Sequence, residues 1–158
     1  MSALRSSAVI ILLAGSILPR SNAAASSACA GTEPALGSFA AALDEGRFDD
    51  ADSLLQSLIA SHSDCALVTV GLARLTAARG EPDEAERLFS RALTQAPEDA
   101  DVHSLFARFQ LSRGLARQAG FLVSQALTLD PGCVDALVTQ GKLLGLRGLY
   151  RESRAALE

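Results

Sequence analysis

The residues of this chain that could carry out chemistry are few and widely spaced. His62 and Cys65 are three positions apart and could supply two ligands to a metal. A zinc site needs four ligands, however, and His103 and Cys133 stand far along the sequence. There is also no nucleophile elbow, glycine-rich phosphate loop or paired-cysteine redox motif. We therefore expect no catalytic residues, no metal, no cofactor and a protein that is not an enzyme.

The three cysteines cannot all pair within one molecule. Cys65 and Cys133 are separated by two periods of the repeat described below, which places them too far apart for a disulfide bond. The spacing leaves Cys29 with Cys65 as one interpretation. The other, which we prefer from the sequence, is that Cys65 and Cys133 are small buried hydrophobic residues at the starts of helices.

The first 25 residues have the organisation of a secretory signal peptide. Arg5 supplies positive charge, residues 8–18 form a short apolar core, and a cluster of small residues ends at Ala25. We expect a signal peptide over 1–25, a flexible linker over 26–31 and a periplasmic or secreted protein, and cleavage after Ala30 is the next candidate. An uncleaved anchor is an alternative, although the apolar core is about half as long as a bilayer-spanning helix requires.

A lipoprotein is a further alternative to the cleaved, unmodified chain. Ser27, Ala28 and Cys29 resemble the end of a bacterial lipobox, in which the cysteine becomes the acylated first residue. Ser26 departs from that pattern, which has a larger aliphatic residue there, and the apolar core ends too early. We therefore expect simple cleavage rather than lipid modification of Cys29.

The composition favours helices and argues against a nucleic-acid partner. Among 158 residues there are 29 Ala and 26 Leu, which are strong helix formers, whereas Val and Ile are sparse after the apolar core. The formal net charge is −4, so the chain lacks the positive field that binding to phosphates needs. No stretch approaches the ~18 apolar residues of a membrane-spanning helix.

A repeat of 34 residues organises the chain from residue 32 onward. Between the repeated positions, apolar residues recur at helical spacing, so each period contains two helices. The first helix should end near a glycine and the second before a proline. The repeated structural positions are Gly46, Gly80, Gly114 and Gly148, then Ala51, Ala85 and Ala119, then Phe89, then Ala92 and Ala126, and finally Pro97 and Pro131.

This pattern resembles the tetratricopeptide repeat in its period, its helix pairs and the order of Ala85, Phe89, Ala92 and Pro97. The resemblance implies an all-α fold, a right-handed α-solenoid of antiparallel helix pairs with about three and a half repeats. The array should occupy 32–158. Its repeats should be 32–65, 66–99, 100–133 and an incomplete 134–158.

The last repeat should be short. We expect its second helix to begin near Tyr150 and to stop at Glu158, about half the length of its counterparts. Solenoids usually cover such a flank with a capping helix. The uncovered flank therefore suggests self-association, a partner surface or a shortened form of a longer protein.

The resemblance also implies how such a protein functions: the first helices of successive repeats line a concave groove that receives a segment of a protein or peptide partner. Arg74, Arg108 and Lys142 recur at the period and, by the resemblance, face this groove. We expect them to form a basic ladder that selects an acidic segment. Alternatively, Asp101 and Asp135 neutralise the ladder internally.

The sequence thus predicts an exported protein-interaction scaffold, with the role of an accessory factor of an envelope, pilus or secretion assembly as the specific hypothesis. The rival hypothesis is the N-terminal repeat portion of a larger glycosyltransferase-type or sulfotransferase-type enzyme that lacks its catalytic domain. In some members of the family that this chain resembles, Lys, Asn and Arg side chains of the groove bind the C-terminal carboxylate of the partner. We do not expect this here, because Arg74 is the only basic residue at the corresponding positions.

Overall fold

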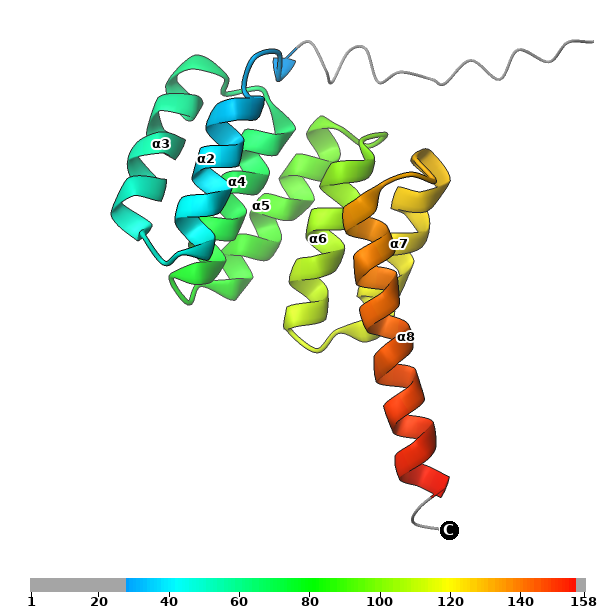
Figure 1. Cartoon of the computed structure of the whole chain (residues 1–158). Coiled ribbons are helices and arrows are strands. Elements are labelled where there is room, and N and C mark those ends of the chain that lie inside the picture. The colour runs from blue at the N-terminus through cyan, green and yellow to red at the C-terminus, as the bar shows by residue number, and fades with distance from the viewer. Residues whose placement is uncertain (1–27, 156–158) are drawn as a thin grey trace, which may run out of the picture.

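The computed structural model describes residues 28–155, with side chains described over 28–148 (Figure 1). The predicted signal peptide, 1–25, lies outside the described residues. Within them the regular structure is helical and no strand is present. The helices are α2 (Glu33–Asp44), α3 (Phe48–Ser61), α4 (Ala66–Ala78), α5 (Pro82–Gln95), α6 (Ala100–Ser112), α7 (Ala116–Leu129) and α8 (Val134–Ala155).

The helices form antiparallel pairs that stack side by side. α2 packs with α3, α4 with α5, and α6 with α7, and α8 packs against both α6 and α7 (Figure 1). Successive first helices also contact one another, α2 with α4, α4 with α6 and α6 with α8. The predicted all-α solenoid of helix pairs is therefore confirmed, with three complete pairs and one further helix in the described residues.

Glycines end the first helices as predicted for the three complete repeats. Gly46, Gly80 and Gly114 have φ angles of 74°, 86° and 77°, a left-handed conformation that glycine adopts without strain. After each glycine, the backbone N–H of the next residue donates a hydrogen bond to a carbonyl near the end of the helix, as in Arg47 to Ala42 at 2.8 Å. These local bonds turn the chain into the second helix.

Prolines mark the ends of the second helices. α5 ends at Gln95 and α7 at Leu129, each two residues before Pro97 or Pro131, as predicted. The next first helix then begins after a short loop. For α6 the cap is Asp99, whose carboxylate accepts hydrogen bonds from two backbone N–H groups of the first turn.

Small residues let the helices approach closely, and one aromatic cluster joins two repeats. The repeated alanines are completely buried: Ala51, Ala85, Ala92, Ala119 and Ala126. Phe89 of α5 is also fully buried, and its ring lies 5.0 Å from the ring of Phe106 and 4.9 Å from that of Phe109, both in α6. The core therefore runs without interruption from the second pair into the third.

The last repeat differs from the prediction. We expected one helix to end near Gly148 and another to begin near Tyr150, but α8 is continuous from Val134 to Ala155. The described positive φ angles are at Gly31, Gly46, Gly80 and Gly114, and Gly148 is not among them. Glycine permits a left-handed turn but does not force one. Because no second helix packs back on α8 within the described residues, nothing there stabilises a turn.

The disulfide pairing is the second difference. Cys29 and Cys65 form a disulfide bond with their Cα atoms 4.9 Å apart, so the interpretation of Cys65 as a free buried thiol is wrong. Cys133 is buried and free, as expected. Cys29 lies within the segment expected to be a flexible linker, but it is buried, and the Thr32 hydroxyl donates to its carbonyl at 2.7 Å. The end of that segment is therefore covalently linked, through Cys29, to Cys65 at the start of α4.

Candidate functional site

Two adjoining cavities lie along the first helices. One has a volume of about 210 Å³ and the other about 380 Å³, and Arg74 and Leu105 line both. We call the residues around these two cavities the groove. Its lining comes from α2, α4, α6 and α8, with Phe89 of α5 as the one exception in the described lining. The groove is thus where the sequence analysis expected the binding surface.

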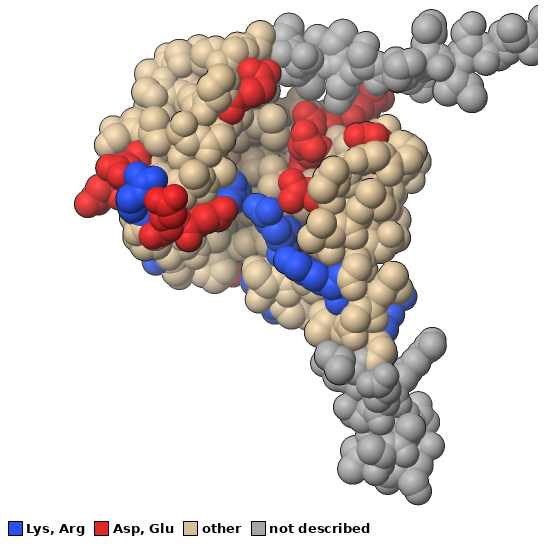
Figure 2. Space-filling model, in the orientation of Figure 1, with Lys and Arg blue, Asp and Glu red and all other residues tan. Residues whose placement is uncertain are grey.

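The groove carries charge of both signs. Figure 2 shows Lys and Arg side chains in a line across the middle of this face, with a group of Asp and Glu side chains above them. Between these charges the groove is lined by apolar side chains, which include Leu36, Phe39 and Val70. A bound segment would therefore meet apolar surface, a line of cations and an acidic edge.

Arg74 is the most enclosed cation of the groove. Its side chain is only 19% exposed, and its guanidinium carbon lies 5.9 Å from the centre of the Phe39 ring. One nitrogen lies 3.4 Å from a carboxylate oxygen of Asp44. Burial lowers the pKa of Arg74, and the positive charge of Arg108 lowers it further. This cation is therefore desolvated and only loosely neutralised in the free protein.

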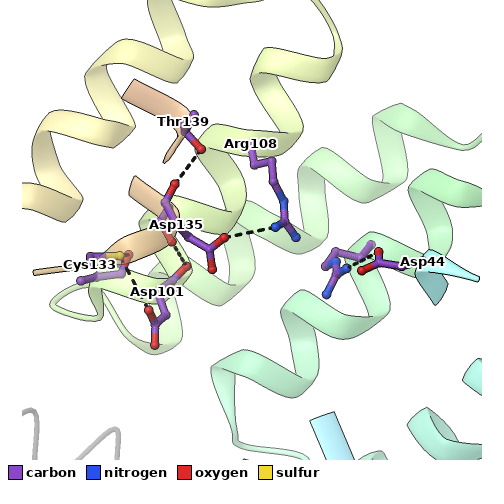
Figure 3. A network of polar contacts seen from close by, with 9 residues as sticks. Asp44, Asp101, Arg108, Cys133, Asp135 and Thr139 are labelled. Atoms are coloured by element: carbon purple, nitrogen blue, oxygen red, sulfur yellow. Dashed lines mark hydrogen bonds and ion pairs between the residues drawn. The ribbon is translucent and has the colours of Figure 1, made fainter. Parts of the chain in front are cut away.

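The structure brings Arg74 and Arg108 together and leaves Lys142 apart. Both arginines line the larger cavity. Arg108 donates to a carboxylate oxygen of Asp135 at 3.2 Å (Figure 3). Lys142 is exposed on α8 and lines neither cavity. The predicted ladder therefore has two members in the groove, with the third further along α8.

Asp101 and Asp135 have different partners. Asp135 pairs with Arg108, whereas the Cys133 thiol donates to Asp101 at 3.8 Å (Figure 3). Burial raises the pKa of Asp101, and the neighbouring carboxylates of Asp99, Asp135 and Asp130 raise it further. Asp135 therefore neutralises Arg108 of the ladder, and Asp101 does not take part in this pairing. Because Asp101 and Asp135 stand in the first turns of α6 and α8, the N-terminal ends of these two helices form an acidic edge of the groove.

Two groove residues were missed by the sequence reasoning. Phe39 is 1% exposed and lies against Arg74, while Asp44 is the carboxylate paired with that arginine. Both belong to the first repeat, which departs most from the 34-residue pattern, so no repeated column pointed to them. A pairing across 30 positions depends on how α2 stacks on α4 and leaves no local signal.

Two general findings concern the rest of the described chain. No group of three or more His, Cys, Asp or Glu residues is arranged so that it could hold a metal ion over the described range. None of the helices in that range has the length and apolar character of a membrane-spanning segment. His62 contacts the neighbouring Ser61 hydroxyl at 2.8 Å.

Comparison with known proteins places the repeats. The sequence profile described as tetratricopeptide repeat matches residues 42–109, a range that contains Arg74 and Arg108. No curated protein matches the chain. Among the solved structures that match is the Yersinia enterocolitica type III secretion chaperone SycD in complex with a peptide of the translocator YopD. The TM-score is 0.54 at 16% identity, over 77% of this chain and 93% of that chain, a likeness that shows a shared fold.

Proposed function

Because the chain is a tetratricopeptide repeat protein, we propose that it is a non-catalytic scaffold that binds an extended segment of a partner protein in the groove. The observation that carries this proposal is the pair of adjoining cavities that meet at Arg74 and Leu105. Side chains on one face of an extended segment are ~7 Å apart. A segment that crosses Arg74 and Leu105 borders both cavities, and alternate side chains of the segment point to the same side, toward the groove.

The two arginines of the larger cavity, Arg74 and Arg108, support an acidic side chain as the ligand there, whereas the acidic edge of Asp101 and Asp135 lies along the smaller cavity. Arg74 is mostly enclosed, and the pair of Arg74 with Asp44 is long, at 3.4 Å. The carboxylate of Asp44 is itself 76% exposed. Pairs with such exposed partners contribute only ~0–1 kcal/mol to stability, so an incoming carboxylate can replace Asp44 at little cost. An acidic side chain near Arg74 also gains from Arg108, which lines the same cavity.

Binding of designed peptides tests this proposal. Fluorescently labelled extended peptides that alternate Leu with Glu are compared with the same peptides carrying Gln in place of Glu, by fluorescence anisotropy at several salt concentrations. We expect the acidic peptide to bind more tightly and to lose affinity as salt increases. The double variant R74Q/R108Q should weaken binding about tenfold, which corresponds to ~1.4 kcal/mol, and flatten the salt dependence.

The matched control is R87Q/R91Q, which removes the same charge from α5, where both side chains are exposed and neither lines the groove. This control should bind the acidic peptide almost as well as the unmodified protein. Equal weakening by the two double variants would mean that only net charge matters. Unchanged binding by R74Q/R108Q would remove the two arginines from the binding surface. Either result contradicts the proposal.

We also propose that the protein is exported and assists an envelope, pilus or secretion assembly. The leader over 1–25 supports export, and so does the disulfide between Cys29 and Cys65, because such bonds persist in oxidising compartments. The same disulfide argues against lipidation, since the Cys29 sulfur cannot carry a lipid thioether at the same time. The likeness to SycD, whose structure contains a translocator peptide, supports the assembly role.

Intact-mass analysis of the protein made in a bacterial host tests export. The expected mass is that of a chain beginning at Ser26 and lacking the two thiol hydrogens that the disulfide removes. A chain that still begins at Met1 in the membrane fraction would contradict cleavage. A lipid-modified Cys29 would replace the proposal with the lipoprotein alternative.

A further inference from the structure

The two cavities of the groove lie toward different ends of the first helices. Arg74 and Leu105 line both cavities. The other residues that α4 and α6 contribute to the smaller cavity belong to the N-terminal halves of these helices, and those that they contribute to the larger cavity belong to the C-terminal halves. A segment that lies along α4 and α6 would therefore pass from one cavity to the other.

A negative and a positive side chain stand two turns apart on α6. Asp101 and Arg108 are seven residues apart, which places them on the same side of the helix and about 10 Å apart along its axis. Asp135 and Lys142 repeat this spacing on α8. The acidic edge, Asp101 and Asp135, thus lies at one end of the groove. We call Arg74 and Arg108 the arginine pair, and it lies toward the other end.

The acidic edge is open to solvent and only partly neutralised. Asp101 and Asp135 are both exposed. Asp135 has Arg108 as its ion-pair partner, whereas Asp101 belongs to none of the ion pairs within the described range. The side-chain contact that Asp101 does make is with the Cys133 thiol, which is a weak hydrogen-bond donor (Figure 3). A cation brought to this edge would therefore neutralise a carboxylate that has no cationic partner there.

The surface between the acidic edge and the arginine pair is apolar. Leu36 and Phe39 of α2 and Leu67 and Val70 of α4 line the smaller cavity, which has a volume of about 210 Å³. Burying a polar or charged group against such side chains without a partner costs free energy, whereas burying an apolar side chain is favourable. The middle of the groove is therefore suited to an apolar side chain.

We propose that the partner segment presents three side chains to the groove in order: Lys or Arg at the acidic edge, an apolar side chain in the middle, and Asp or Glu at the arginine pair. The inference rests on the proposed function and specifies which segment binds. In an extended segment, side chains on one face are ~7 Å apart, so the first and the third are ~14 Å apart. Flexible Lys and Glu side chains at these positions can reach charges that stand about 10 Å apart.

The first test compares designed peptides on the unmodified protein. Labelled peptides with the central sequence Lys-Ser-Leu-Ser-Glu, and with the reverse order, are compared by fluorescence anisotropy with the same peptides carrying Gln in place of Lys. We expect Lys to increase the affinity about fivefold in at least one of the two orders, as for one exposed ion pair. Equal affinities of the Lys and Gln peptides in both orders would overturn the proposal.

The second test assigns the gain from Lys to the acidic edge. Asp101→Asn keeps the shape of the side chain and removes its charge, so the gain should fall at least twofold while the Gln peptides bind as before. Asp64→Asn is the matched control, because it removes one charge at an exposed loop residue that lines neither cavity. This control should retain the full gain. An undiminished gain in Asp101→Asn, or an equal loss in the two variants, would overturn the proposal.

The Gln peptides separate this inference from the proposed function on which it rests. They carry the apolar and acidic side chains that the proposed function requires and lack the cation that the inference adds. If they bind and Lys brings no gain, the inference is overturned and the proposed function stands. If none of the peptides binds, both are overturned.

Discussion

Two arginines one period apart, Arg79 and Arg113, stand at the C-terminal ends of α4 and α6 and form ion pairs with neighbouring helices. Arg79 pairs with Asp52 of α3 at 3.1 Å, and Arg113 pairs with Glu86 of α5. Each arginine thus contacts the second helix of the preceding repeat. Arg113 also lies over the Phe109 ring, with its guanidinium carbon 5.6 Å from the ring centre. These single residues join neighbouring repeats at their surface.

The pairing of Glu86 predicts a pH-dependent contribution to stability. Hydrogen bonds from Arg113 and Gln110 lower the pKa of Glu86 below its ordinary value of 4.5. Because the folded pKa is lower than the unfolded one, the stabilisation is fully present above the unfolded pKa and disappears as pH falls through the folded pKa. Replacing Glu86 by Gln should therefore reduce the free energy of unfolding at pH 7 by at most ~1 kcal/mol, since the pair is partly exposed.

Urea denaturation at several pH values measures this effect. The difference between the unmodified protein and the Glu86→Gln variant should shrink toward zero in strong acid. Asp64→Asn provides a matched loss of one negative charge at an exposed loop residue and should have little effect. A difference for Glu86→Gln that is the same at pH 7 and in strong acid would rule out the ion pair as its cause.

At the scale of elements, the contact between α5 and α6 depends on one aromatic side chain. Phe89 is completely buried and stacks on Phe106 and Phe109 of the next repeat. Solenoid stability comes from such contacts between neighbouring repeats, because a single helix pair cannot bury its own apolar faces. Phe89 therefore couples the second repeat to the third.

Replacing Phe89 by Ala should lower the free energy of unfolding by about 3–5 kcal/mol, through lost burial and the cavity left behind. Thermal or urea unfolding followed by circular dichroism measures the change. Phe121→Ala is the matched control, because Phe121 is 64% exposed and its removal should change stability little. Equal effects of the two substitutions would contradict the role of the aromatic stack.

At the scale of the whole molecule, stability should decrease from the middle of the array toward its C-terminal end. Residues 82–129 have packed neighbours on both sides, whereas α8 has a neighbour on one side within the described chain. Hydrogen exchange at low protein concentration should therefore be slowest over 82–129 and fastest over 134–155. Uniform protection to the end of α8 in a monomer would contradict this gradient, while protection gained only at high concentration would accompany self-association.

The disulfide stabilises the opposite end of the molecule. Cys29 and Cys65 are 36 positions apart, and cross-linking a loop of that length is worth about 4 kcal/mol in the chain-entropy account. Reduction should lower the melting temperature and expose α2 and α3 to hydrogen exchange before the later repeats. Exchange in the reduced protein that accelerates equally in all repeats would contradict a local role for the bond.

The 34-residue period, read from the sequence alone, predicted the helix pairs of the three complete repeats and the glycines and prolines near which their helices end. These features depend on neighbouring residues: a glycine that turns the chain, a proline that cannot continue a helix and the spacing of apolar positions. The groove location followed from the resemblance, and Arg74 and Arg108 do line it.

Only the tertiary structure decided the contacts between segments far apart in the chain. Arg74 meets Asp44 and Cys29 meets Cys65 because α4 stacks on the first helix pair, and nothing local in the sequence determines those distances. The straight course of α8 through Gly148 is of the same kind, because a glycine fits both a helix and a turn. Whether the chain turns there depends on what packs against it.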